Sequence, residues 1–135
     1  MKIEINNQVN AKIDLKLIKK VIVVFGRVYK VSKNKEVSLA FVGDAEIKKL
    51  NFTCRGLNKV TDVLSFSDEG ENLGEIIIDY NQIKRQAGDF KNSAEKELIF
   101  ILVHGLLHLI GYDDKINKDR EKMIKRGEKF IKDYL

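Results

Sequence analysis

The sequence predicts a single α+β domain spanning residues 1–135, in which helices pack against a small mixed β-sheet. Three observations lead to this prediction. Strand-like and helix-like segments are mixed along the chain without a strict βαβ alternation. No proline, low-complexity tract or internal repeat divides the 135 residues, which fit one domain of ordinary size. Hydrophobic residues make up 44% and charged residues 33% of the chain, a balance that excludes both a disordered tail and a membrane protein.

Two strands and two helices are expected in the first half of the chain. Residues 2–6 alternate between polar and apolar side chains, as a short strand does. Apolar positions follow helical spacing over 14–29, although four successive β-branched residues mildly oppose a helix there. Residues 37–42 indicate a buried strand. Asp44 is expected to cap a helix that ends near Phe52.

A hairpin is expected in the middle of the chain. Residues 54–61 form a polar loop, and short strands follow at 63–66 and 73–79. The polar segment between these strands contains Gly70, which is typical of a hairpin connection.

Three helices complete the expected fold. The first covers about 80–88. The second is long, with Asn92 and Glu95 as its capping pair, and it ends at Gly111. The last runs from about Asn117 to the C-terminus, and its core face carries Met123, Ile124, Phe130 and Ile131.

The long helix carries the most informative pattern in the sequence. Its stretch 98–110 is apolar on all sides except at His104 and His108, the only histidines of the chain, so we expect this helix to be buried. Residues four apart project from one helix face, one turn from each other. Two imidazoles placed in this way can bind one metal ion, and zinc accepts such nitrogen ligands at about 2.0–2.1 Å.

A carboxylate follows the histidines at the spacing of a third ligand. Gly111 is expected to reverse the chain, so that Asp114, three residues later, can fold back toward the histidines. Its neighbour Asp113 or a water molecule are the alternatives for this position. The pattern H-x-x-x-H-x-x-G-x-x-D has the spacing of metzincin-type zinc sites, with a carboxylate in place of the third histidine. The sequence therefore predicts a zincin-like metal-binding helix.

Two other interpretations of the histidines are weaker. A single histidine on an apolar helix is usually a core residue bonded to a backbone carbonyl, but two of them would need two separate partners. A metalloprotease would carry its glutamate base directly after the first histidine, where this sequence has Gly105. Peptide hydrolysis by the usual zincin route is therefore disfavoured.

The loop near residue 55 gives a weaker signal. Arg55, followed by Gly56, could hold a phosphate through its bidentate guanidinium, but spacing alone favours an ordinary surface arginine. The pair Thr61-Asp62 could simply form a capped turn before a strand. Cys54 is expected to be a small buried or half-buried residue, since no partner for a nucleophile is nearby.

The charge of the chain is modestly basic. Lys and Arg number 25 against 20 Asp and Glu, which gives a net charge of +5. Residues 115–135 contribute +4 of this total. A basic surface favours polyanions such as RNA or anionic lipid. For any single residue of 115–135, a solvated helix face is the stronger interpretation.

Several features favour an intracellular, cytoplasmic protein without a membrane segment. The single cysteine, Cys54, leaves no intrachain disulfide to form, which suits a reducing compartment. Residues 1–5 lack the apolar core of a signal peptide. The longest apolar stretch, 98–110, is too short to span a bilayer.

Several segments together resemble the YbeY family of bacterial endoribonucleases, also called rRNA maturation factors. The resemblance covers about residues 37–114. It rests most strongly on the stretch His-Gly-Leu-Leu-His-Leu-Ile-Gly-Tyr-Asp-Asp at 104–114, and on Thr-Asp-Val-Leu-Ser-Phe at 61–66. Asn51, Arg55-Gly56 and Gly74 also match the family pattern, and Glu75 stands where that pattern has an aspartate.

The resemblance implies a zinc ion held by three side chains, which would be His104, His108 and Asp114 here. It implies a metal-dependent endoribonuclease specific for single strands that acts in processing of the small-subunit ribosomal RNA, in ribosome quality control, or both. It also implies that Arg55 lies near the metal and contributes to activity. We further expect a substrate groove beside the metal, with Arg55 and Lys59 on its wall. The sequence departs from the family where Asp114 replaces a histidine and Glu75 replaces an aspartate.

The departure at Asp114 leaves the identity of the metal open, because a carboxylate adds a negative charge to the site. The main alternative function is a non-catalytic RNA-binding factor for ribosome assembly, with a structural metal. A metalloprotease is the less favoured third interpretation.

Overall fold

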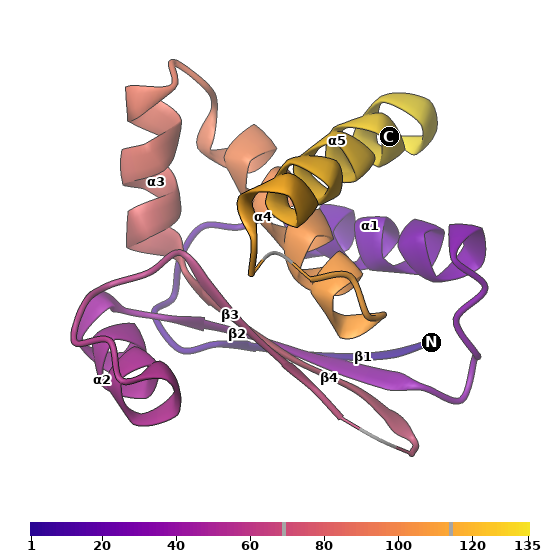
Figure 1. The fold of residues 1–135 in the computed structure, drawn as a ribbon, viewed down its shortest axis with the longest axis horizontal. Helices are drawn as coiled ribbons and strands as arrows, with labels where there is room; N and C mark the ends of the chain where they lie inside the picture. Colours follow the sequence, from indigo (N-terminus) through magenta and orange to yellow (C-terminus); the bar gives the residue numbers. More distant parts are fainter. Residues whose placement is uncertain (69, 114) are drawn as a thin grey trace.

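The structure is a computed structural model that describes residues 1–68, 70–113 and 115–135. Figure 1 shows helices gathered on both sides of one sheet. In chain order the elements are β1 (Lys2–Asn7), α1 (Leu15–Val28), β2 (Glu36–Val42), α2 (Asp44–Arg55), β3 (Val63–Ser67), β4 (Asn72–Asp79), α3 (Tyr80–Asp89), α4 (Ala94–Leu109) and α5 (Asn117–Tyr134). The predicted α+β architecture is confirmed.

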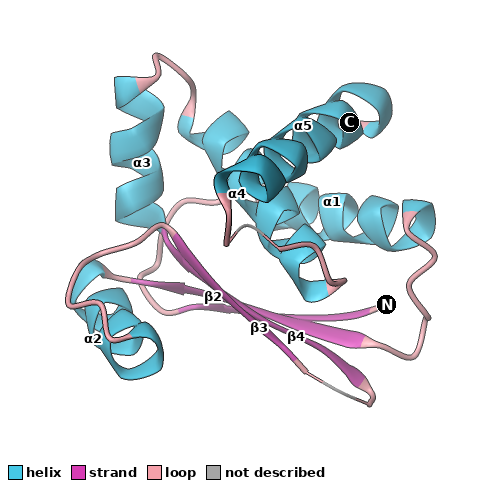
Figure 2. Ribbon diagram, viewed as in Figure 1, coloured by secondary structure: helices cyan, strands magenta, loops and turns pink. Residues whose placement is uncertain are grey.

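The four strands form one mixed sheet in the order β1-β2-β4-β3. β2 pairs in parallel with β1 and with β4, whereas β3 and β4 form the expected antiparallel hairpin. Figure 2 shows this sheet as a twisted layer with β3 and β4 side by side. The sheet therefore places β3 at one of its edges, next to the helices described below.

The sheet has a large core on one face and a small one on the other. Alternate residues of a strand point to opposite faces. In β4, Ile76 and Ile78 join the main core together with side chains of α1, α4 and α5, whereas Ile77 joins Ile47 of α2 and Leu64 of β3 in a second cluster. Figure 1 accordingly shows α2 on one side of the sheet and the other helices on the opposite side.

Helix α4 is the central element of the main core. Nine of its sixteen residues are buried, as its apolar composition predicts. Gly105 brings it close to the sheet: a Cβ at this position would lie 3.2 Å from Ser65 Oγ and 3.3 Å from two carbon atoms of Ile76. On the other side of α4, Gly127 allows α5 to approach within van der Waals contact of Val103.

Several helix ends differ from the prediction. Asp14 caps α1 through a hydrogen bond that its Oδ1 accepts from Leu17 N. The N-cap of α2 is Gly43 rather than Asp44, so the expected cap was wrong. The long helix is capped by Ser93, whose Oγ accepts from Lys96 N at 3.1 Å, and not by the pair Asn92 and Glu95. A hydroxyl one position closer to the first turn reaches this N–H group directly.

Helix α2 is also longer than predicted. It continues through Cys54 and Arg55, which the sequence assigned to a loop, and it stops where Gly56 adopts a left-handed φ of 73°. Glycine favours this backbone conformation because it has no Cβ. Cys54 is exposed, so its expected burial was wrong.

Among the described residues, none of the helices has the length and apolar character that crossing a bilayer requires.

Candidate active site

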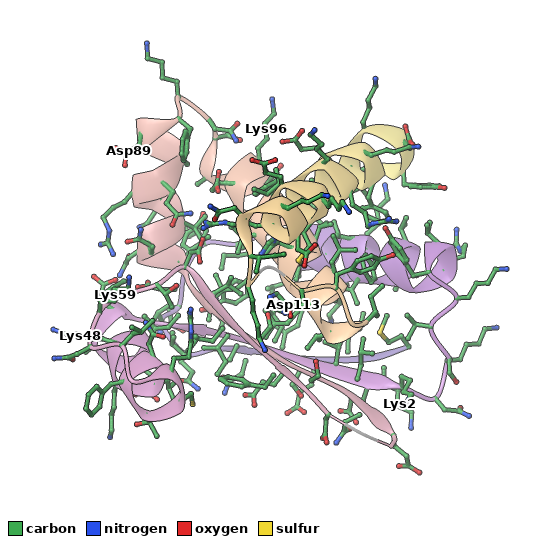
Figure 3. The ribbon with its side chains drawn as sticks, in the orientation of Figure 1. Lys2, Lys48, Lys59, Asp89, Lys96 and Asp113 are labelled. Atoms are coloured by element: carbon green, nitrogen blue, oxygen red, sulfur yellow. The ribbon has the colours of Figure 1, made fainter. Side chains whose placement is uncertain are left out.

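A cleft of about 1020 Å³ lies between β3, α3, α4 and the start of α5, and it includes the end of α2 and the loop after it. The candidate metal ligands and cationic groups from the sequence that line this cleft are Arg55, Lys59, His104, His108 and Asp113. Figure 3 shows Lys59 beside α2, Asp89 at the end of α3 and Asp113 near the start of α5. Residues far apart in the sequence thus meet at one surface.

His104 and His108 occupy one wall of the cleft. Their ring centroids are 5.9 Å apart and the ring planes are inclined by 72°. Both side chains are half-buried within an otherwise buried helix, so their imidazoles face the cleft and not the core. The sequence prediction that both histidines project from one face of the helix is confirmed.

The turn after the histidines has the predicted form. Gly111 has a φ of 109°, and its N–H donates to His108 O. Tyr112 N donates to Leu107 O at 3.1 Å, which completes a Schellman motif at the end of α4. The Arg126 guanidinium lies 4.6 Å from the Tyr112 ring centroid and ties the turn to α5.

The third predicted metal ligand, Asp114, lies outside the described residues. Its neighbour Asp113 lines the cleft and accepts a hydrogen bond from Lys115 N. In the described part of the chain, no three His, Cys, Asp or Glu side chains are grouped so that they could hold a metal ion. Asp113 therefore does not complete a ligand set with the two histidines there.

The two imidazoles suit a zinc ion in kind and in placement. Zinc prefers nitrogen donors of this type, and a catalytic zinc ion needs an open position that solvent or substrate can reach. His104 and His108 meet the first condition by their chemistry and the second by their exposure to the cleft. The assignment of Asp114 as third ligand stays a prediction.

Arg55 reaches the cleft because α2 ends next to it. Its exposed side chain belongs to the last turn of α2, and exposed Lys59 lies four residues further on. Asn51, which is fully buried, donates from Nδ2 to Lys59 O at 3.0 Å and so fixes the connecting loop. The buried amide thus holds the loop that carries Lys59, whereas α2 itself carries Arg55.

The surroundings of Gly105 disfavour a glutamate base of the metalloprotease type at this position. Its Cα hydrogen faces Ser65 and Ile76 of the sheet, where even a Cβ would be tightly packed. A glutamate there would crowd the Ser65 and Ile76 side chains, which would have to shift to make room for it. The structure thus supports the sequence argument against peptide hydrolysis.

The sequence did not point to two polar cleft residues, Gln86 and Glu97, and it indicated Asp62 only as part of a capped turn and of the family motif. Gln86 Nε2 donates to Asp62 Oδ2 at 3.2 Å and to Glu97 Oε1 at 3.5 Å, so one amide links the start of β3, α3 and α4. Burial raises the pKa of Glu97, and the nearby Asp62 carboxylate raises it further. The spacing of Glu97, Ile101, His104 and His108 along one helix face could have revealed this alignment.

Glu97 positions the cleft walls and lies away from the histidines. It precedes His104 by two helical turns, or about 10 Å along the axis. A general base must lie within hydrogen-bond reach of the proton that it removes. We therefore place Glu97 in the network that holds α3 against α4, and not beside a group bound to both histidines.

A second polar network anchors α2 to α3, on the two sides of the cleft. Arg85 makes a bidentate hydrogen-bonded ion pair with Asp44, with distances of 2.8 and 3.2 Å. Asp79 is fully buried and caps α3 by accepting from Asn81 N at 3.0 Å. Burial and the neighbouring Asp44 carboxylate raise the pKa of Asp79 to about 6, whereas the hydrogen bond from Arg85 lowers that of Asp44 to about 2.

The raised pKa of Asp79 predicts a pH-dependent stability. Between about pH 4 and pH 6 the folded chain holds a proton that the unfolded chain has released, since the ordinary value is 3.8. This group therefore lowers the free energy of unfolding as pH rises through that window. Asp79→Asn removes the effect and keeps the cap, because its amide oxygen can still accept from Asn81 N. We expect a gain of roughly 1–3 kcal/mol at pH 7, since one pKa unit corresponds to about 1.4 kcal/mol.

Urea unfolding at several pH values between 4 and 7 measures this gain. Asp133→Asn, which changes an exposed aspartate of α5, is the matched control and should keep the pH slope of the original protein. An unchanged slope in Asp79→Asn would contradict the assignment.

Comparisons with known proteins identify the family. The family model described as Endoribonuclease YbeY matches residues 2–135. The Endoribonuclease YbeY of Lacticaseibacillus paracasei is 38% identical over 130 residues, which cover 87% of this chain and 86% of that protein. The protein of the same name from Phytoplasma australiense is 38% identical over 140 residues and covers 98% of this chain and 94% of its own length.

A solved structure supports the same relationship at the level of fold. The solution structure of TM1509 from Thermotoga maritima matches with a TM-score of 0.66 and 30% sequence identity. The match covers 96% of this chain and 87% of that one. By fold, by family match and by relatives along nearly its whole length, the chain belongs to the YbeY endoribonuclease family.

Proposed function

We propose that the protein is a metal-dependent endoribonuclease that cleaves single-stranded RNA in the cleft described above. One observation carries the proposal: the fold brings two histidines of α4 to the same cleft as Arg55 from the end of α2. Two imidazoles supply metal donors, and a guanidinium supplies a phosphate donor. Relatives that match most of this chain carry the name endoribonuclease, which supports RNA as the substrate.

Each of these residues would have a separate role in binding the metal or the RNA. His104, His108 and Asp114 would hold a zinc ion, which when bound supplies Lewis-acid charge next to a phosphodiester. Arg55 would bind the non-bridging phosphate oxygens through two N–H groups and offset the negative charge that develops on them. Lys59 and, on the α5 side, Lys115 and Arg120 would bind neighbouring phosphates, since all three line the cleft.

A metal titration of RNA cleavage tests this function. The purified protein should cleave a single-stranded RNA, lose that activity with a chelator and regain it when zinc is added back. His104→Ala, purified in parallel, controls for contaminating ribonucleases. Binding of RNA without chelator-sensitive cleavage would favour the non-catalytic assembly factor instead.

Replacing Arg55 with alanine is expected to lower cleavage strongly without unfolding the protein. The side chain is exposed at a helix end, so its loss should change stability by no more than about 0.5 kcal/mol. Loss of one donor to a developing charge typically lowers the rate by roughly 100-fold or more. The measurement is the cleavage rate of a labelled RNA at saturating metal, together with the metal content.

Lys48→Ala is the matched control, because it removes an exposed cation from the same helix without touching the cleft. If Arg55→Ala kept full activity and full metal content, Arg55 would have no part in the mechanism.

The proposed biological substrate is ribosomal RNA of the small subunit, in the cytoplasm. The net charge of +5 and the two cleft-lining cations of residues 115–135 support a polyanionic partner. Depletion of the protein should lead to accumulation of small-subunit RNA precursors with unprocessed ends. After crosslinking in cells, purification of the protein should recover small-subunit ribosomal RNA bound to it. Normal precursor processing in depleted cells would argue for another RNA substrate.

A further inference from the structure

Phe90, at the end of α3, is exposed inside the same cleft. With 75% of its surface exposed, it is the most exposed of the large hydrophobic side chains in the described ranges, and it joins neither hydrophobic cluster of those residues. Single exposed hydrophobic residues are common on protein surfaces, so exposure alone indicates little. The position of Phe90 on the wall of a cleft that contains Arg55 and both histidines is the informative feature.

The backbone around Phe90 is held in place by the end of α3. Phe90 N donates to Gln86 O, and Lys91 N donates to Gly88 O at 3.2 Å. Asn92 N donates to Ala87 O at 2.8 Å, which completes a Schellman motif like the one at the end of α4. An aromatic ring on a fixed backbone loses little conformational entropy when a ligand packs on it.

Phe90 shares the cleft with polar, acidic and cationic side chains, and the acidic Asp89 precedes it directly on α3. Gln86, one turn earlier on α3, lines the cleft and bonds to Asp62 and Glu97. Arg55 and Lys59 line it from the α2 side. An exposed ring in the same cleft as cations that can follow a phosphate backbone is a combination by which proteins bind single-stranded nucleic acids.

We propose that Phe90 is a positioning residue on which one unpaired base of the RNA stacks while the adjoining backbone reaches Arg55 and the histidines. The inference rests on the proposed function and deepens it, because it gives the cleft a means to select single strands. A base within a duplex has both faces covered by its neighbours and cannot offer one to a protein side chain.

Binding of an RNA that resists cleavage tests the stacking directly. The probe is a fluorescently labelled oligoadenylate with 2′-O-methyl groups, and binding to the metal-loaded protein is followed by anisotropy. Phe90→Ala is expected to weaken binding by roughly 5- to 20-fold, within the range found for one stacked base. Phe90→Trp should restore it, because a larger ring still stacks.

Phe52→Ala is the matched control. Phe52 is also an exposed phenylalanine, at 58%, but it lies on α2 outside the residues that line the cleft. Its replacement should leave binding unchanged. A base analogue reports the contact itself: 2-aminopurine in the probe should lose fluorescence when bound to the original protein and keep most of it with Phe90→Ala.

The outcomes separate this inference from the proposed function. Equal binding by the original protein, Phe90→Ala and Phe52→Ala would overturn the stacking role, even if cleavage is normal. A loss that is as large for a duplex RNA as for the single strand would also overturn it. Failure of the original protein to cleave RNA with any metal would overturn the proposed function, but the binding comparison would still decide whether Phe90 holds a base.

Discussion

Replacing His108 with alanine is expected to abolish tight zinc binding and RNA cleavage while the fold persists. His108 is half-buried at the cleft, and the core of α4 is made by its apolar neighbours, so the helix should remain packed. Mutation of groups that merely support a metal ligand costs about 10- to 100-fold in metal affinity, and removal of a ligand should cost at least as much. Metal content by mass spectrometry and cleavage of a labelled RNA measure the two losses.

Variants of the two neighbouring aspartates identify the third ligand. Asp114→Ala should lose metal nearly as completely as His108→Ala if Asp114 is the ligand. Asp113→Asn should keep the bound metal, because the asparagine amide oxygen can still accept the hydrogen bond from Lys115 N that shapes the turn. Equal and negligible metal in the original protein, His108→Ala and Asp114→Ala would end the metal-site hypothesis.

Replacing Gly74 with alanine is expected to cause the largest loss of stability of any substitution considered for this protein. Gly74 is buried in β4 with a φ of 150°, a conformation that side chains rarely adopt. An added Cβ would lie 2.3 Å from Phe66 O in the neighbouring strand and 2.7 Å from Leu109 Cδ2 in α4. Strain and overpacking together should cost roughly 3–5 kcal/mol, a large part of the stability of an ordinary domain.

Thermal and urea unfolding of Gly74→Ala measure this cost. Gly88→Ala is the matched control: a Cβ at Gly88 in α3 would meet no other atom within 4 Å, and its φ is not in the left-handed range. Alanine favours a helix over glycine, so this control should be neutral or stabilising by up to about 1 kcal/mol. If both alanine variants unfolded at the same urea concentration as the original protein, this result would contradict the close packing of Gly74 against β3 and α4.

Sequence periodicity predicted the elements well where their apolar pattern was long. The helix from Leu15 formed despite its four β-branched residues, because Val21 and Ile22 are completely buried and tertiary packing outweighs a small propensity cost. Helix ends were less predictable. Asp44 and Asn92 have the side chains of good caps, yet the caps are Gly43, which has no side-chain oxygen, and Ser93, whose hydroxyl stands one residue closer to the first turn than Asn92.

The sequence by itself determined that His104 and His108 share one side of a helix and that Gly111 reverses the chain after them, because these features depend only on helical spacing and on the freedom of glycine. Spacing alone favoured an ordinary surface arginine at position 55 and the family resemblance predicted it near the metal, but only the tertiary structure shows that Arg55 lines the same cleft as the histidines. The tertiary structure also placed Phe90 and Glu97 there. Which side chains of separate elements share a cleft depends on how α2, α3 and α4 pack around one sheet. Local spacing along a chain contains no information about such contacts.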